Sequence, residues 1–377
     1  MADPADLGDA RAPADPADPR DRMLGATLRG AYRLDAIIGR GTMGAVYRAT
    51  RLRDGRPVAV KVQAPEGLLS DPSRRDEFRR RFERETVATL TLDHPNTVKV
   101  IDFGTHEGSV SFLVLELLRG RTLRELLATR RGLGSERTAR IAVQMARALE
   151  HAHGLDIVHR DLKPENVFIC DGGDLPDHVK VMDFGIVRLL GKPAEATQLT
   201  RVGHSLGTLA YMSPEQATNR PVGPATDIYS LGVMIHEMLT GRPPFEAANP
   251  LMIAVMHIEN APPPLAVPGM EPALMARWQE LLDRLLSKAE GERPRRAGEV
   301  ARALTPMLTP GDRRDLEALR PTGPARRVRS APREATTGEA PATARSGLGR
   351  LWLWAVLALA VGATGAGLAW LVAWLRG

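Results

Sequence analysis

The sequence predicts an α+β protein of two lobes, a small β-sheet lobe with one helix and a larger helical lobe, followed by a polar linker and one transmembrane helix. Three observations predict this organisation. Apolar residues alternate along the first third of the chain, as they do on one face of a strand, and they recur at helical spacing beyond about residue 120. Further on, residues 351–375 form a run of 25 residues without a charge.

The first lobe is expected to contain several short strands. A strand over residues 32–38 ends at a glycine cluster, and a second strand begins at residues 46–47. Valines alternate over residues 58–62 and so form one face of a third strand. Residues 74–88 are expected to form a single helix among these strands.

The second lobe is expected to be helical. Apolar residues recur at helical spacing between Ile141 and Ala152, and a more broadly apolar run extends over residues 228–239. At the start of the chain, residues 1–28 are expected to form a disordered tail, because their Asp-Pro-Ala-Asp repeats are polar and rich in turns. No apolar run follows a positive start, so no signal peptide is expected.

Composition excludes several classes of protein. Charged residues make up 25% and hydrophobic residues 43% of the 377 residues, which is typical of a folded protein and not of a collagen or a polytopic membrane protein. The only cysteine, Cys170, excludes an intramolecular disulfide and suits a reducing compartment. Residues 305–350 carry a net charge of +4 and Arg376 adds one, so the first 304 residues carry about +1 of the total of +6.

A glycine-rich motif lies between the first two predicted strands. Residues 39–46 read Gly-Arg-Gly-Thr-Met-Gly-Ala-Val, with glycines where a backbone can approach a ligand closely. A dinucleotide site would require a helix at the third glycine, whereas strand formers follow it here. On the third strand, Ala59 and Lys61 lie on the face opposite the valines, so a small residue and a cation point toward the space under this hairpin.

Two further motifs decide the resemblance. Residues 159–166 read His-Arg-Asp-Leu-Lys-Pro-Glu-Asn, and residues 183–185 read Asp-Phe-Gly. Together with the glycine-rich hairpin and the lysine strand, these motifs resemble the signature set of the protein kinases. The resemblance covers about residues 32–305. It is closest to the eukaryotic-like bacterial Ser/Thr protein kinases, which have phrases similar to those at residues 94–96, 102–104 and 213–216.

The resemblance implies a bilobal kinase domain over residues 29–305, with an N-lobe at about 29–116 and a C-lobe at about 119–305, and it implies ATP and Mg²⁺ as cofactors. Lys61 would contact the α and β phosphates while paired with Glu85, with Glu83 as the alternative. The adenine would lie between Val46 and Ala59 on one side and Phe168 on the other. The hairpin that covers the phosphates would consist of Gly39, Arg40, Gly41, Thr42, Met43 and Gly44, and the hinge would run from Glu116 to Leu118 after the gatekeeper Leu115.

The resemblance also assigns the catalytic residues. Asp161 would orient the substrate hydroxyl or accept its proton, and Lys163 would steady the transferred phosphate. Asn166 and Asp183 would bind Mg²⁺ through oxygen atoms. The lysine two residues after Asp161, together with Thr208, is similar to Ser/Thr kinases rather than to Tyr kinases.

Three more residues are expected to organise the C-lobe. The resemblance implies a buried ion pair between Glu215 and Arg293, and it places Asp227 against the backbone at His159 and Arg160. Residue 213 is serine where the family more often has alanine, a small change that leaves the glutamate in place.

The segment between Asp183 and Glu215 is expected to regulate the enzyme. In this family the cation next to the catalytic aspartate, Arg160 here, binds an anion from that segment. A phosphate on a threonine there would order the segment through charge-assisted hydrogen bonds. Candidate phosphorylation sites are Thr200 first, and then Thr197 and Ser205, and autophosphorylation is expected at this segment.

The last part of the chain is expected to attach the kinase to the cell inner (plasma) membrane. Residues 306–350 predict a disordered basic linker, rich in Pro, Arg and Ala, that lies against anionic lipid. Residues 351–375 would span a hydrocarbon core of about 30 Å. The arginines before this span place the kinase domain in the cytoplasm, and no sensor domain is expected beyond it. Small residues at four-residue spacing allow self-association, and tryptophans suit the two membrane interfaces at Trp352, Trp354, Trp370 and Trp374.

Three alternatives remain open from the sequence. A small-molecule kinase would share the hairpin, the lysine and the catalytic aspartate but would lack the long segment that ends at Glu215. A membrane-tethered pseudokinase scaffold would normally have lost Lys61, Asp161 or Asp183, which are all present. A nucleic-acid binder is disfavoured, because the excess positive charge adjoins the predicted span and has no aromatic residues among it. We therefore expect protein substrates and membrane lipid as partners, and no nucleic acid.

Overall fold

The computed structural model describes residues 23–41, 44–63, 80, 82, 86, 89–106, 110–129, 132–172, 175–184 and 209–319. The predicted membrane span lies outside these residues. None of the helices within the described ranges is both long and apolar enough to cross a membrane. Of the helix predicted at 74–88, only Arg80, Phe82 and Thr86 are described, and all three are helical.

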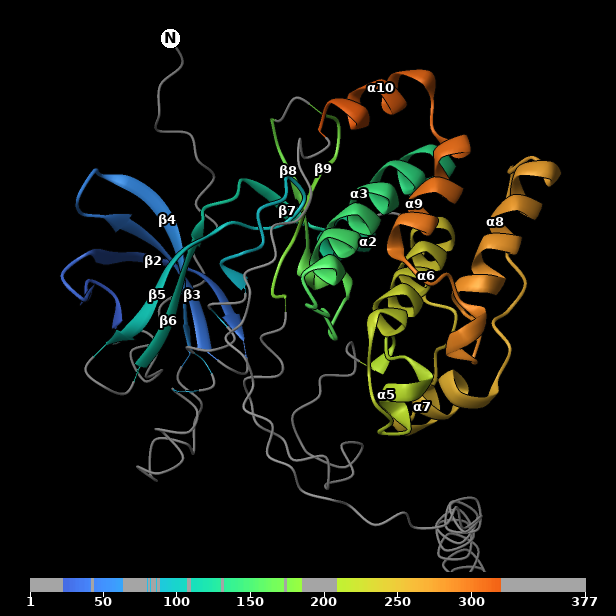
Figure 1. Cartoon of the computed structure of the whole chain (residues 1–377), viewed down its shortest axis with the longest axis horizontal. Coiled ribbons are helices and arrows are strands. Elements are labelled where there is room, and N and C mark those ends of the chain that lie inside the picture. The colour runs from blue at the N-terminus through green and yellow to red at the C-terminus, as the bar shows by residue number, and fades with distance from the viewer. Residues whose placement is uncertain are drawn as a thin grey trace, which may run out of the picture. The chain divides into compact units, whose positions relative to one another are not determined.

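The first lobe is built on a six-stranded sheet in the order β1-β2-β3-β4-β6-β5, in which every pair of neighbours is antiparallel (Figure 1). The expected strand-rich lobe is therefore confirmed. The strands are β1 (Thr27–Leu28), β2 (Tyr32–Gly41), β3 (Gly44–Arg51), β4 (Arg56–Gln63), β5 (Val100–His106) and β6 (Val110–Glu116).

The core of this sheet lies on the face that the valines of β4 form. Val58, Val60 and Val62 are buried in one cluster with Tyr47 of β3 and Phe112 of β6. β-Branched and aromatic side chains fill such a pleated surface well, which explains why these residues form central strands. Lys61 belongs to the opposite face of β4, and its side chain is 22% exposed.

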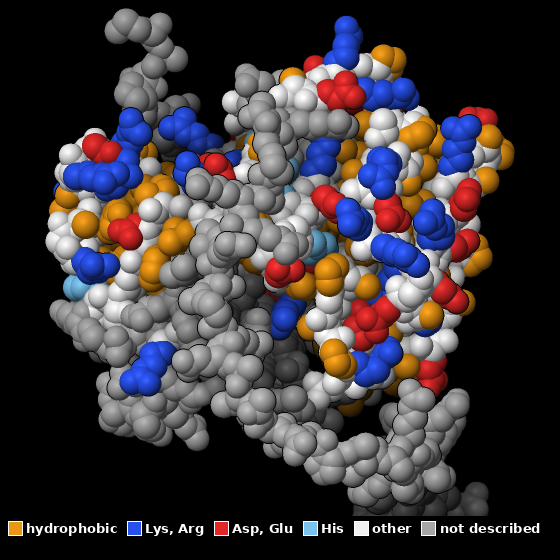
Figure 2. Space-filling model, viewed as in Figure 1, with side chains coloured by type: hydrophobic (Ala, Val, Ile, Leu, Met, Phe, Trp, Pro, Cys, Tyr) orange, Lys and Arg blue, Asp and Glu red, His pale blue; other side chains and the backbone are white. Residues whose placement is uncertain are grey.

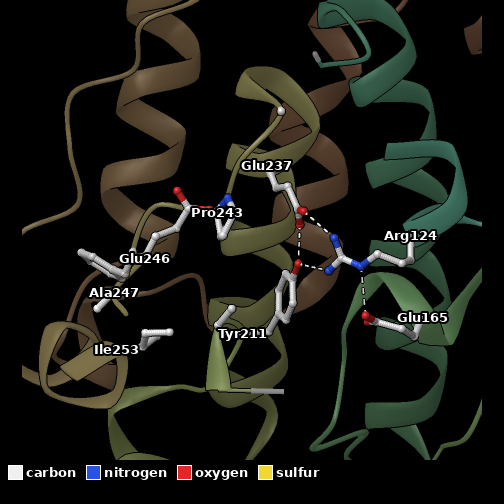
Figure 3. Close-up of a pocket in the computed structure, with 11 residues that line it drawn as sticks. Arg124, Glu165, Tyr211, Glu237, Pro243, Glu246, Ala247 and Ile253 are labelled. Carbon is white, nitrogen blue, oxygen red and sulfur yellow. Dashed lines mark hydrogen bonds and ion pairs between the residues drawn. The ribbon is translucent and has the colours of Figure 1, made fainter. Parts of the chain in front are cut away.

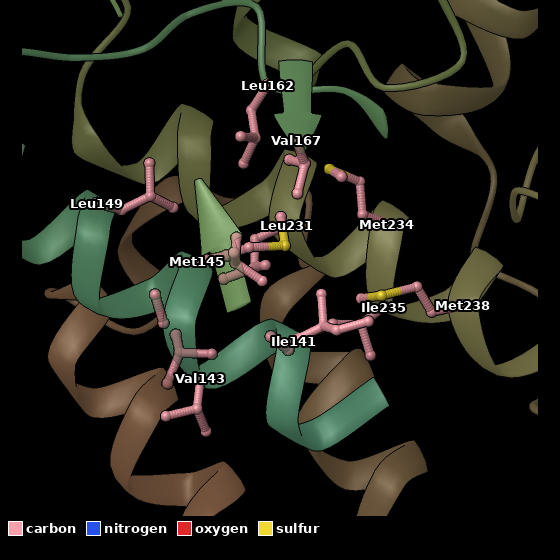
Figure 4. Packing of buried hydrophobic residues seen from close by; sticks show 14 of the residues in the cluster. Ile141, Val143, Met145, Leu149, Leu162, Val167, Leu231, Met234, Ile235 and Met238 are labelled. Carbon is pink, nitrogen blue, oxygen red and sulfur yellow. The ribbon is translucent and has the colours of Figure 1, made fainter. Parts of the chain in front are cut away.

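The second lobe is helical, as expected (Figure 1). Its centre is formed by α3 and α6, whose inward-facing residues pack together: Ile141, Met145 and Leu149 come from α3, and Met234 and Met238 come from α6 (Figure 4). The helices are α2 (Leu123–Ala128), α3 (Ser135–Gly154), α5 (Pro214–Ala217), α6 (Pro224–Thr240), α7 (Pro250–Glu259), α8 (Pro272–Leu285), α9 (Ala297–Leu304) and α10 (Pro310–Ala318). Short 3₁₀ turns occur at η2 (Pro164–Asn166), η5 (Glu290–Glu292) and η6 (Thr305–Met307).

A small second sheet connects this lobe to the first. Its antiparallel strands are β7 (Gly120–Thr122), β8 (Val167–Cys170) and β9 (His178–Val181). Val181 of β9 pairs in parallel with Thr97, and the Val98 amide donates to the Val181 carbonyl over 3.0 Å. The chain just before β5 of the first lobe is thus hydrogen-bonded to the strand that leads into Asp183.

The folded residues extend past both predicted domain boundaries. Leu28, which the sequence placed in a disordered tail, is fully buried in the core of the first sheet. At the other end, α10 lies within the predicted linker, yet Leu316 is fully buried and Arg140 of α3 binds Asp312 over 2.9 Å. Composition alone did not reveal this helix, because Leu316 is its only buried apolar residue. The described fold therefore continues beyond residue 305, to Leu319.

Charge on the helical lobe is mixed. The view in Figure 2 shows lysine and arginine side chains interspersed with aspartate and glutamate over the face that carries α8, α9 and α10. This pattern agrees with the near-neutral charge that the sequence assigns to the first 304 residues.

Candidate active site

Lys61 and Asp183 come together from positions 122 residues apart in the chain. The Lys61 Nζ atom lies 2.6 Å from Asp183 Oδ2. Burial raises the pKa of Asp183, but the adjacent Lys61 ammonium outweighs burial and holds that pKa below the ordinary carboxyl value. The aspartate is therefore ionised at neutral pH and ready to bind a cation.

A second cluster surrounds Asp161. Lys163 Nζ lies 2.8 Å from Asp161 Oδ2. Asn166 donates through Nδ2 to the Asp161 carbonyl over 2.7 Å and to Oδ2 over 3.3 Å. These bonds use the amide nitrogen of Asn166, so among its described contacts the amide oxygen remains available as a ligand for a hard cation.

One buried aspartate, Asp227, binds the backbone just before Asp161. Asp227 of α6 accepts hydrogen bonds from the His159 and Arg160 amides, both over 2.8 Å, and its Oδ2 lies 2.7 Å from His153 Nε2. Arg160 has a φ of 68°, a left-handed conformation that is unfavourable for a residue with a side chain. The two bonds to Asp227 hold this conformation in place, as the sequence resemblance led us to expect.

His159 connects the two halves of the site. Its Nε2 donates to the Met182 carbonyl over 2.8 Å, and its Nδ1 accepts from the Asp161 amide over 3.3 Å. Its ring also packs against Phe184, with 4.8 Å between ring centroids. The loop of Asp161 and the chain that carries Asp183 are therefore fixed relative to each other.

The glycine-rich hairpin forms between β2 and β3, where Gly39 pairs with Val46 and Gly41 with Gly44. Gly44 has a φ of +145°, and a Cβ atom there would lie 1.9 Å from the Val62 carbonyl oxygen. A Cβ atom on Gly41 would meet nothing closer than 3.9 Å. Packing within the protein therefore explains why residue 44 must be glycine. It does not require a glycine at residue 41, where the missing side chain leaves space that a ligand can approach.

The predicted adenine residues lie on neighbouring strands. Val46 pairs with Lys61 across β3 and β4, and Ala59 pairs with Leu115 across β4 and β6. Phe168 is on β8, where it pairs with Lys180 of β9. The register thus brings the residues from the first sheet to adjacent positions next to Lys61.

The predicted hinge contains an ion pair that the sequence did not reveal. Glu116 Oε1 accepts from Lys180 Nζ and from the Lys99 amide, each over 2.8 Å. The glutamate therefore joins the end of β6 to β9, and its carboxylate supports the hinge. Leu118 follows in the connection to β7 and is half-buried.

Glu215 and Arg293 form a fully buried pair. Two parallel bonds of 2.8 and 3.0 Å join the guanidinium to the carboxylate, and Thr226 donates to the same carboxylate over 2.7 Å. Burial raises the pKa of Glu215, but the hydrogen bonds from Arg293 and Thr226 outweigh it and hold that pKa below its usual value. Glu215 lies in the first turn of α5, so the pair fixes the end of the segment that begins at Asp183.

Sequence reasoning missed Arg124, which joins α2 to η2, to α6 and to Tyr211. From α2 it donates to Glu165 of η2 over 2.9 Å, to Glu237 of α6 over 2.8 Å, and to the hydroxyl of Tyr211 (Figure 3). Tyr211 in turn donates to Glu237 over 2.5 Å. The available signal was the Thr122–Glu125 capping box, which marks a helix start there but does not indicate where Arg124 points.

Several predicted residues lie outside the described residues, so their roles stay predictions. They are Thr42 and Met43 of the hairpin, Glu85 and its alternative Glu83, and the activation-segment residues Thr197, Thr200, Ser205 and Thr208.

Comparison with known proteins decides the family. The profile of the protein kinase domain matches residues 32–303, which is most of the chain. The chain belongs to the protein kinase family. Serine/threonine-protein kinase pkn3 of Myxococcus xanthus is 37% identical to it over 274 residues, or 73% of this chain and 49% of that protein.

Two further bacterial relatives support the same class of kinase. Serine/threonine-protein kinase PknA of Mycobacterium tuberculosis is 37% identical over 319 residues, or 81% of this chain and 70% of PknA. The probable serine/threonine-protein kinase SCO3848 of Streptomyces coelicolor is 41% identical over 238 residues, or 62% of this chain and 34% of that protein. The kinase thus spans about half the length of pkn3 and about a third of SCO3848, and it carries the catalytic domain of serine/threonine protein kinases.

The residues present fit a nucleotide with Mg²⁺. No group of three or more His, Cys, Asp or Glu side chains that could hold a metal ion occurs in the described part of this kinase. Mg²⁺ at phosphoryl-transfer sites needs only one or two protein ligands, because substrate phosphates and water complete its shell. Asp183 and Asn166 would supply the protein oxygens, and the bound ion would neutralise charge on the phosphates.

The chain's own groups account for the rest of the chemistry. Lys61 and Lys163 supply fixed positive charge at the two clusters, where negative charge develops during phosphoryl transfer. Asp161 can orient a substrate hydroxyl and take its proton, because Asn166, Lys163 and the Asp227-supported backbone hold its carboxylate in place.

Proposed function

We propose that this chain is a membrane-anchored serine/threonine protein kinase that acts in signal transduction. It transfers the γ-phosphate of ATP to serine and threonine hydroxyls of proteins, with Mg²⁺ as the metal. The observation that carries this proposal is the contact of Lys61 with Asp183 over 2.6 Å beside an Asp161 held by Asn166 and Lys163. Kinase members that serve only as scaffolds have no need of these charged contacts.

A phosphorylation assay on the full chain tests the activity. Purified protein in neutral liposomes is incubated with Mg²⁺ and γ-labelled ATP, alone and with a generic basic protein as acceptor. Lys61→Met and Asp161→Asn variants serve as matched controls, because each removes one charged group from the site. We expect both variants to lose nearly all incorporation into either acceptor. Equal phosphate incorporation by the wild type and both variants would contradict the proposed kinase activity at this site.

Autophosphorylation of the activation segment is part of the proposal. Arg160, next to Asp161, belongs to a sequence pattern that in this family binds a phosphate from that segment, and Thr200 is the first candidate acceptor, before Thr197 and Ser205. Mass spectrometry after incubation with Mg-ATP checks it. An active enzyme with an unmodified segment contradicts this part of the proposal and leaves the kinase activity standing.

Membrane attachment rests on the 25 uncharged residues at 351–375 and on the arginines before them. Anchoring raises the effective concentration of one kinase for another, so activation between neighbouring copies should be faster in the membrane. The test compares autophosphorylation of the intact protein in liposomes and in dilute detergent. Equal rates per molecule would remove this role for the anchor.

A further inference from the structure

Residues 210–216 run into α5 and border the loop that carries Asp161. Gln216 donates through Nε2 to the carbonyl of Arg160, the residue before Asp161, over 2.7 Å. The Arg124 contacts described above join the same segment to η2 (Figure 3). A protein substrate whose hydroxyl reaches Asp161 therefore passes close to this segment, and a shift of the segment would move the substrate.

Two side chains from the helices behind this segment hold it by its backbone. Ser230 of α6 donates to the Tyr211 carbonyl over 2.8 Å. Nε2 of His257, which is on α7 and fully buried, lies 3.1 Å from the Ala210 carbonyl oxygen. A carbonyl oxygen can only accept, so this ring nitrogen carries the proton and donates.

The bond to Ala210 is the last in a chain of hydrogen bonds that begins at a half-buried lysine. Burial lowers the pKa of His257 to about 3, so its ring is neutral and its Nδ1 accepts. The Tyr229 hydroxyl donates to that Nδ1 over 2.8 Å, and its oxygen accepts from Lys288 Nζ over 3.4 Å. All three donors therefore point the same way, from Lys288 toward Ala210, and bonds aligned in this way strengthen one another.

Lys288, which follows α8, also fastens the elements that carry this chain of bonds. Its ammonium donates to the His257 carbonyl over 2.9 Å and to the Met256 carbonyl over 3.4 Å. Nζ lies 4.6 Å from the centre of the Phe245 ring and 5.7 Å from that of Tyr229. An ammonium group has three N–H donors for the two carbonyls and the Tyr229 oxygen, whereas a neutral amine has two. The charged form of Lys288 therefore holds α6 and α7 together most firmly.

We propose that His257, Tyr229 and Lys288 are positioning residues of the kinase reaction. Together they set the backbone at Ala210 and so the approach of a protein substrate to Asp161. The inference rests on the proposed function, because it requires a protein substrate. Breaking the chain of hydrogen bonds should weaken the binding of that substrate and should leave the binding of ATP, which uses the first lobe, unchanged.

The test is steady-state kinetics of the full chain in neutral phosphatidylcholine liposomes, with Mg-ATP and a generic basic protein as substrate. Tyr229→Phe removes only the hydroxyl in the middle of the chain of bonds. We expect the KM for the basic protein to rise about two- to tenfold, which is the effect of one lost hydrogen bond. The KM for ATP should change by less than about twofold. A merely structural role would lower kcat through loss of folded enzyme and leave both KM values unchanged.

Variants of His257 separate its hydrogen bonds from its packing. His257→Phe removes both ring nitrogens and should raise the KM for the basic protein at least as much as Tyr229→Phe does. His257→Gln keeps an N–H donor at about the reach of Nε2, so it should restore part of the loss. His236→Gln is the matched control, because His236 is also buried in the helical lobe but bonds to the Arg242 carbonyl. It should leave both KM values unchanged.

The pH dependence of KM gives a second readout. Burial first, and then Arg293, lower the pKa of Lys288 to about 8, and Arg293 is itself paired with Glu215. The titratable groups that Lys288 contacts, Tyr229 and His257, stay neutral because burial raises the pKa of the tyrosine and lowers that of the histidine. The KM for the basic protein should rise between pH 7 and 9 in the wild type. In Lys288→Met it should be raised already at pH 7 and should not change further, so titration of the substrate itself would appear in both proteins.

The outcomes distinguish this inference from the proposed function. Phosphorylation of the basic protein with an unchanged KM in Tyr229→Phe and Lys288→Met overturns the inference and leaves the function standing. An equal rise in the KM for ATP also overturns it, because the whole site would then be disturbed. Should His257→Phe fail to fold, the other two variants decide. Absence of phosphate on the basic protein with the wild type overturns the proposed function, and the inference with it.

Discussion

Removing the charge of Glu215 tests how much one buried ion pair contributes to the stability of this kinase domain. Both side chains of the Glu215–Arg293 pair are 0% exposed. Breaking a buried pair by removing one partner typically costs about 3–5 kcal/mol, because the other charge is left uncompensated. In Glu215→Gln, Arg293 keeps carbonyl acceptors at Ser287, Lys288 and Ala225 and lies over the Tyr229 ring at 4.9 Å. We therefore expect the lower end, about 3 kcal/mol.

The loss should be visible in thermal unfolding of the full chain in detergent, followed by circular dichroism. At about 2–4 °C per kcal/mol for a large domain, the melting temperature should fall by roughly 6–12 °C. Glu290→Gln is the matched control, since Glu290 pairs with Arg220 over 3.6 Å at an exposed site. That change should cost under about 1 kcal/mol.

The pH dependence gives an independent check on the same pair. The pKa of Glu215 in the folded state lies below its ordinary value. Ionised Glu215 therefore contributes fully to the free energy of unfolding above the unfolded-state pKa of about 4.3, and this contribution is lost as the pH falls through the folded-state pKa. The difference between wild type and Glu215→Gln should therefore be largest at neutral pH and shrink below about pH 4. A stability loss under about 1 kcal/mol at pH 7, or one that grows in acid, would refute this reasoning.

Four other changes have distinct expected results. Asp161→Asn should lower kcat by about 10²–10⁴-fold without changing the unfolding midpoint, as measured by steady-state kinetics and thermal unfolding. Gly44→Ala should destabilise the domain by at least about 1–3 kcal/mol in denaturant titration, because of its φ and the β4 carbonyl, whereas Gly41→Ala should cost less than Gly44→Ala. Leu316→Ala should cost about 2–5 kcal/mol, and an unchanged midpoint would mean that α10 does not stabilise the domain. Burial lowers the pKa of His257 to about 3, so the free energy of unfolding should decrease as the pH falls below about 6.5, where the unfolded chain binds a proton that the folded chain does not. In His257→Gln, the free energy of unfolding measured in urea should therefore depend less on pH between pH 7 and 4.

Local sequence patterns predicted the architecture well, because apolar residues recur at strand spacing in the first lobe and at helical spacing in the second. The alternating valines of β4 face a buried core, and the helical spacing of α3 matches its buried residues. Such patterns arise from burial on one face, and burial is also what fixes these elements in the fold. The boundaries were less predictable, since α10 is a mostly polar helix whose single buried leucine creates no period.

Contacts between residues far apart in the chain could not be predicted from the sequence either. The sequence motifs identified Lys61 and Asp183 individually, but nothing local indicated that Lys61 Nζ would lie within hydrogen-bond distance of Asp183 Oδ2. Arg124 shows the same limit more strongly. Its helix could be predicted from the capping residues, whereas its three partners come from elements 41 to 113 residues away. Long arginine side chains reach across elements in ways that residue spacing along one helix does not encode.

The position of α10 has a mechanical consequence. The chain leaves the described domain at Leu319, directly after a helix that is fastened to α3 by the Arg140–Asp312 ion pair and by the hydrogen bond from Arg147 to the Leu316 carbonyl. Any tension on the residues that follow would be taken up first by these two contacts and by buried Leu316. The α6 helix, which shares the core of the helical lobe with α3, would bear such a load only after α10 had separated from α3.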